Sequence, residues 1–91
     1  MQIIELLAIN QQRFTKILIL ETKDQSKNPA IDNIKEKHIF NSMDQVSRDF
    51  YEIEANDYFL LDKEGLEHIV YTSQNLDLDI EEDDRVLVIL I

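Results

Sequence analysis

The amino-acid sequence predicts a single α+β domain in which one main helix packs across a mixed β-sheet. Three observations support this fold class. The chain has 91 residues, the size of one domain. Short aliphatic and β-branched runs alternate with polar stretches, as strands and loops do, and the segment after Ser42 has the apolar spacing of an amphipathic helix. Hydrophobic residues make up 44% of the chain, which excludes a disordered acidic tail.

The first elements expected along the chain are two strands. Residues 3–9 are strongly apolar, and residues 14–21 are rich in aliphatic and β-branched side chains. The polar residues 10–13 between them have the length of a hairpin loop, so a β-hairpin is predicted. The apolar residues of the first segment also have helical spacing, which leaves a helix as the alternative.

Residues 22–40 are expected to form a polar insertion in this domain. Residues 22–27 contain no apolar side chain and predict a loop. Asn28 and Pro29 suit the start of a helix, and the apolar spacing that follows as far as His38 indicates a short helix or helical turn.

The main helix is predicted to follow Ser42. Ser42 and Gln45 have the spacing of a capping box, and apolar residues recur at helical intervals from Met43 onward. The pattern is expected to stop near Asn56 and Asp57.

A second hairpin and a central strand are predicted to complete the fold. Residues 58–62 and 67–72 read as its two strands, with Gly65, the only glycine, at a positive φ in the turn between them. An acidic connection then carries Leu76, Leu78 and Ile80, which are expected to anchor one turn to the core. Residues 85–91 are apolar almost throughout, which is typical of a strand covered on both faces. A hairpin, a crossing helix and a central last strand are the arrangement of a β-grasp fold.

The second half of the chain carries a pattern of apolar spacing and carboxylates: Val46, Phe50, Ile53, Tyr58, Leu60, Leu61, Asp62, Glu64, Gly65, Glu67, Ile69, Ser73, Asp77 and Leu78. This pattern resembles a Phox-and-Bem-type interaction domain, which is a ubiquitin-like β-grasp. The resemblance implies that an acidic turn motif of Asp62, Glu64, Glu67, Asp77 and Asp79 docks on a basic patch of a partner domain. Leu66 departs from the family pattern, which usually has an acidic residue there. Residues 78–88 are also similar to the end of the small ubiquitin-like accessory proteins of bacterial type-seven secretion.

The charge of the chain is divided unevenly. The whole chain has 19 acidic and 9 basic residues and a net charge of -10. After Met43 there are 14 acidic and 3 basic residues, and the densest run of acids lies at residues 77–84. Such a face repels nucleic acid and anionic membrane and attracts basic protein surfaces. A solvated face that only maintains solubility remains the alternative.

The residue types argue against an enzyme, a metal site or a cofactor site. With one glycine and no cysteine, the chain lacks phosphate-binding glycine loops, thiolate metal ligands and a cysteine nucleophile. His38 and His68 have no carboxylate partner fixed by the predicted elements, so a zinc site is not expected. The serines lack the context of a nucleophile, so we expect neither a catalytic residue nor a cofactor.

The function expected from these features is that of a cytoplasmic interaction module, in its own cell or in an infected host cell. It would dock an acidic face on a protein with a basic surface, without binding nucleic acid or membrane. The expected contacts combine the carboxylates with two tyrosine anchors: Asp62, Glu64, Glu67, Asp77, Asp79, Glu81, Glu82, Asp83, Asp84, Tyr58 and Tyr71.

An alternative hypothesis is a phage-type inhibitor that mimics nucleic acid, like anti-CRISPR or anti-restriction proteins. Its carboxylates would occupy the basic channel of a nucleic-acid enzyme. Glu52, Glu54 and Asp57 would then join the acidic run at residues 81–84 as contact residues.

Overall fold

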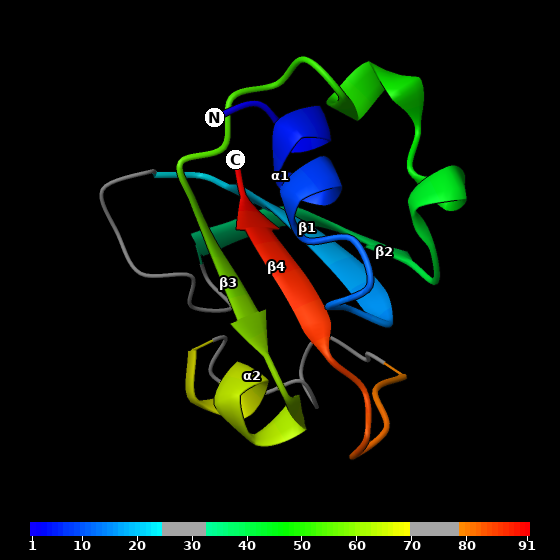
Figure 1. The fold of residues 1–91 in the computed structure, drawn as a ribbon. Helices are drawn as coiled ribbons and strands as arrows, with labels where there is room; N and C mark the ends of the chain where they lie inside the picture. The colour runs from blue at the N-terminus through cyan, green and yellow to red at the C-terminus, as the bar shows by residue number, and fades with distance from the viewer. Residues whose placement is uncertain (25–32, 70–78) are drawn as a thin grey trace.

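Four strands form one mixed sheet at the centre of the molecule (Figure 1). The structure is a computed structural model and describes residues 1–24, 33–69 and 79–91. The strand order is β2-β1-β4-β3, with β1 parallel to β4 and both outer strands antiparallel to their neighbours. The strands are β1 (Lys16–Thr22), β2 (Ile34–Phe40), β3 (Asp57–Leu61) and β4 (Val86–Leu90). This arrangement confirms the α+β class and the mixed sheet.

The C-terminal strand lies in the middle of the sheet, as its composition predicts. All five residues of β4 are buried, because β1 and β3 pair with its two edges and other elements cover both faces. Leu87 and Ile89 pack in the hydrophobic cluster on one face of the sheet, and the alternate residues of β4 pack in the cluster on the other face.

Each face of the sheet carries its own hydrophobic cluster. On one face α1 (Ile3–Ile9) buries Ile3, Leu6 and Leu7 against β1 and β4. On the other face α2 (Lys63–Ile69) contributes Leu66, which is packed with the predicted anchor Ile80. Both of these residues are buried, so the expectation for Ile80 is confirmed. Leu76 and Leu78 lie outside the described residues.

Residues 3–9 form a helix, so the strand predicted for them is wrong and the helical alternative is right. The helix buries the residues at its first, fourth and fifth positions and exposes Ile9, which is the pattern of a helix lying on a sheet. The backbone N–H of Gln2 donates to Oε1 of Glu5 over 2.9 Å, which satisfies one donor at the start of this helix.

Residues 34–40 form the edge strand β2, so the predicted helical turn is wrong. The segment expected as a polar insertion therefore supplies part of the sheet, while residues 25–32 lie outside the described residues. Six residue pairs join β2 to β1, from Ile17 with Phe40 to Thr22 with Ile34. An edge strand tolerates the many polar side chains that suggested a non-strand segment.

Residues 42–56 do not form the predicted main helix. They contain two single 3-10 turns, η2 (Met43–Gln45) and η3 (Arg48–Phe50). Oγ of Ser47 accepts the N–H of Asp49 over 3.3 Å and begins the second turn. Val46 and Phe50 still reach the cluster beneath α1, so the apolar spacing identified core residues but not the backbone between them.

Residues 63–69 form α2, so the predicted tight turn and the start of the return strand are wrong. Asp62 caps this helix, because its Oδ1 accepts the backbone N–H of Gly65 over 2.8 Å. Gly65 does not have a positive φ. Residues 70–72 of the predicted strand lie outside the described residues. Within the described part of the chain, no helix has both the length and the apolar character needed to cross a bilayer.

Candidate functional site

Acidic side chains gather around a pocket of about 470 Å³ beside α2. The described residues that line it are four carboxylates and one lysine: Asp62, Glu64, Glu67, Glu82 and Lys63. Glu82 comes from the turn before β4, whereas the others lie at the end of β3 and along α2. The fold therefore joins two acidic segments that are separated in the sequence. We call this site the α2 acidic pocket.

The side chains of the pocket are placed by α2 and by its cap. Because Asp62 accepts the N–H of Gly65, its carboxylate lies at the start of the helix. Glu64 and Glu67 are three residues apart on α2, so they lie on the same side of the helix. Leu66, between them in sequence, is fully buried and holds the helix against the sheet.

The turn that carries Glu82 is held by Asp84. Oδ2 of Asp84 accepts the N–H of Glu81 over 2.9 Å, and its Oδ1 accepts the hydroxyl of Thr15 over 2.7 Å. Nζ of Lys16 lies 3.8 Å from the same carboxylate. The backbone hydrogen bond from Glu81 is the main cause that lowers the pKa of Asp84, followed by the hydrogen bond from Thr15. Asp84 thus has internal partners, and its part in partner binding stays a prediction.

The α2 acidic pocket has a strong excess of negative charge. Asp62, Glu64, Glu67 and Glu82 are all exposed. Among residues 1–24, 33–69 and 79–91, none of these carboxylates takes part in an ion pair within 4.0 Å. Lys63 is the only cation among the described residues that line the pocket. The pocket is therefore suited to attract a cationic group.

Three other predicted contact residues lie in the loop that carries Glu82. Asp79, Glu81 and Asp83 are exposed there. Asp77 and Tyr71 lie outside the described residues.

Tyr58 does not lie on the same face of the sheet as α2. It is 42% exposed and pairs with Ile89, whose side chain packs beneath α1. Leu66 of α2 packs on the opposite face. The predicted tyrosine anchor and the α2 acidic pocket are thus on different sides of the sheet.

The carboxylates proposed for nucleic-acid mimicry have mixed surroundings. Oε2 of Glu54 lies 2.8 Å from the N-terminal ammonium group. The hydrogen bond to Glu54 is the main cause that raises the pKa of this ammonium group. Oδ1 of Asp57 accepts the N–H of Tyr58 over 2.8 Å. Glu52 is exposed.

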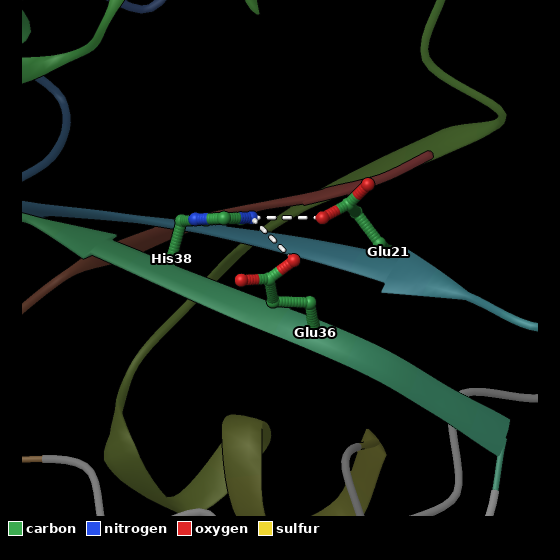
Figure 2. A group of neighbouring side chains, drawn as sticks. All are labelled: Glu21, Glu36 and His38. Carbon is green, nitrogen blue, oxygen red and sulfur yellow. Dashed lines mark hydrogen bonds and ion pairs between the residues drawn. The ribbon is translucent and has the colours of Figure 1, made fainter.

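A second ionisable cluster was not predicted from the sequence. Figure 2 shows Glu21 on β1 pointing toward His38 and Glu36 on β2. Nε2 of His38 lies 2.9 Å from Oε2 of Glu21, and this hydrogen bond is the main cause that lowers the pKa of Glu21. The cluster depends on the pairing of β1 with β2. The apolar spacing in the sequence predicts a helical turn in the segment that contains His38, so it does not predict that His38 and Glu21 lie close together.

Comparison with protein-family models, curated proteins and solved structures finds no match to this chain.

Proposed function

We propose that this chain is a non-enzymatic interaction module that docks the α2 acidic pocket on a basic surface of a partner protein. The observation that carries the proposal is the convergence of Glu64, Glu67 and Glu82 from two segments around one pocket. These carboxylates have no ion-pair partner among the described residues. An arginine or lysine of the partner would supply that counter-charge.

The partner is proposed to be a protein, and the site of action the cytoplasm of the source cell or an infected host. The net charge of -10 disfavours nucleic acid and anionic lipid as direct ligands. Carboxylates at an exposed docking surface mainly raise the association rate and select against wrong partners.

We further propose that the fold is a variant of the ubiquitin-like β-grasp. Two observations support this: the last strand lies centrally and parallel to β1, and β1 and β2 are consecutive antiparallel neighbours. The departure is the helix, because two 3-10 turns occupy the segment where the crossing helix was expected. In its place α1, before the first strand, covers that face of the sheet.

The docking proposal is tested with a variant that removes charge from the pocket without removing the cap of α2. Glu64→Gln, Glu67→Gln and Glu82→Gln are combined, and Asp62 is left intact. The matched control, Asp44→Asn, Asp49→Asn and Glu52→Gln, removes the same charge from exposed residues that do not line the pocket. Wild type and both variants are immobilised, and proteins captured from the source-cell lysate are identified by mass spectrometry.

The expected result is a partner captured by wild type and by the control but lost with the pocket variant. A titration with that purified partner should then show affinity weakened by about tenfold or more at low salt, with less difference at high salt. Equal capture by all three proteins would refute docking through this pocket.

Nuclease treatment of the lysate separates this proposal from nucleic-acid mimicry. A docking partner should be captured equally before and after treatment. A basic nucleic-acid enzyme that is captured better after treatment, and weakened alike by both variants, would favour a phage-type inhibitor instead.

A further inference from the structure

One histidine and two glutamates converge where β1 and β2 pair, away from the α2 acidic pocket (Figure 2). One ligand atom from each of Glu21, Glu36 and His38 can be chosen so that all three lie within 4.8 Å of one another. We propose that these side chains bind one divalent transition-metal ion of the Zn²⁺ type, with water completing its coordination. This site is independent of the proposed docking function.

The pairing register of the two strands builds the cluster. Glu21 and Glu36 are directly opposite each other, and His38 lies two residues farther along β2. Because side chains alternate across a strand, all three project from the same face of the sheet. Ligands carried by paired strands are held more firmly than ligands on a loop.

The distances suit a metal after small side-chain rotations. Nε2 of His38 lies 2.9 Å from Oε2 of Glu21 and 4.0 Å from Oε2 of Glu36. Tetrahedral Zn²⁺ with bonds of about 2.0–2.1 Å places its ligand atoms about 3.3 Å apart. The first of these separations must widen slightly and the second must shorten.

The surroundings of His38 keep it both ordered and reachable. Its ring centroid lies 4.8 Å from that of Phe50, which restricts the rotation of the imidazole. The side chains of His38 and Glu21 are 24% and 31% exposed, so a hydrated ion can reach them from solvent.

The charges of the cluster favour a dication over the metal-free arrangement. Two carboxylates directly opposite each other on paired strands repel. The imidazole of His38 lies within hydrogen-bonding distance of Glu21 only. Its Nε2 is 4.0 Å from Oε2 of Glu36, which is too far for a hydrogen bond. A dication between them would interact favourably with both carboxylates at once.

The donor set indicates which class of metal binds. Imidazole nitrogen with carboxylate oxygens suits Zn²⁺, Ni²⁺, Co²⁺ or Cu²⁺, whereas Ca²⁺ and Mg²⁺ prefer oxygen alone. A carboxylate oxygen accepts hydrogen bonds, so Nε2 of His38 donates to Oε2 of Glu21 in the metal-free arrangement. Metal binding through Nε2 would replace this hydrogen bond, with the ring hydrogen carried on Nδ1.

The proposal is tested by calorimetric titration of the metal-free full chain with ZnCl₂ at neutral pH. Wild type should bind one equivalent with saturation. His38→Gln and Glu21→Gln should each weaken binding at least tenfold. His68→Gln is the matched control, because it removes the other histidine, which is exposed on α2.

Two further measurements keep the test decisive. Glu36→Gln alters a side chain that is 61% exposed, so it tests the site even if replacing His38, which is in contact with the ring of Phe50, destabilises the fold. Millimolar CaCl₂ or MgCl₂ should not displace the Zn²⁺. Absence of saturable binding at millimolar ZnCl₂, binding unchanged in His38→Gln and Glu36→Gln, or equal displacement by CaCl₂ would overturn the proposal.

Discussion

Asp84 illustrates how one residue of an acidic run can be structural while its neighbours are exposed. Its side chain is 13% exposed, and its two oxygens accept hydrogen bonds from Glu81 and Thr15. Thr15 also accepts the N–H of Arg85 over 3.0 Å, so the carboxylate belongs to a network at the entry to β4. Spacing and charge alone do not separate Asp84 from Asp83, which is exposed.

Replacing Asp84 should destabilise the fold in a pH-dependent manner. The pKa of Asp84 is lowered in the folded state, so its contribution is fully present above its unfolded pKa of about 3.9 and is lost as pH falls through the folded pKa. An amide has only one acceptor oxygen for the two donors, so Asp84→Asn should cost about 1 kcal/mol at neutral pH. Urea denaturation at neutral and at acidic pH measures both effects.

The control for this experiment is Asp83→Asn, at the exposed neighbouring carboxylate. It should leave the free energy of unfolding nearly unchanged at neutral pH. Equal destabilisation by the two substitutions, or a loss in Asp84→Asn that persists at the lowest pH, would contradict the role assigned to Asp84.

At the scale of elements, several segments could be predicted and several could not. The short apolar runs in the sequence predict β1, β3 and β4; β1 is largely buried and β4 wholly buried, whereas β3 has no fully buried residue. The apolar spacing of residues 3–9 is compatible with a strand and with a helix, because only the sheet beneath α1 decides whether such a segment packs as a helix. β2 lies at the edge of the sheet and pairs only with β1, so most of its side chains are exposed and many are polar. A polar segment of this kind lacks the apolar run from which a strand is predicted.

The cap of α2 can be separated from the charge of the pocket by two substitutions at one residue. Asp62→Ala removes the acceptor for the N–H of Gly65 and should cost about 1 kcal/mol in the free energy of unfolding. Asp62→Ser keeps a capping oxygen and should cost only a few tenths. Both remove the same charge, and urea denaturation compares their stability.

The same pair of variants also bears on docking. If the charge of Asp62 contributes to partner binding, both should weaken binding similarly despite their different stability. Equal stability of the two variants would show that the carboxylate does not cap α2.

At the scale of the whole molecule, the net charge should make stability depend on salt. The molecule extends over 30 × 28 × 17 Å, and the Debye length is roughly 30 Å at 0.01 M salt and roughly 3 Å at 1 M. At low salt, carboxylates therefore repel one another across the whole domain. The urea midpoint should rise as NaCl is increased between these limits.

The distribution of charge can be tested in the same way. The pocket variant at Glu64, Glu67 and Glu82 should depend less on salt than wild type, and less than the control variant at Asp44, Asp49 and Glu52. A midpoint that falls with added NaCl, or equal salt dependence of the two variants, would contradict a concentration of repulsive charge at the α2 acidic pocket.

The sequence is sufficient to predict the α+β class, the acidic second half and the central position of the last strand. These properties follow from composition and from the need to cover an apolar strand on both faces. Three features depend on the folded arrangement: the direction and register of β2, the helix at residues 3–9 and the approach of Glu82 to α2. Contacts between distant segments set strand register and select between local conformations of similar energy, so local sequence patterns do not predict these features.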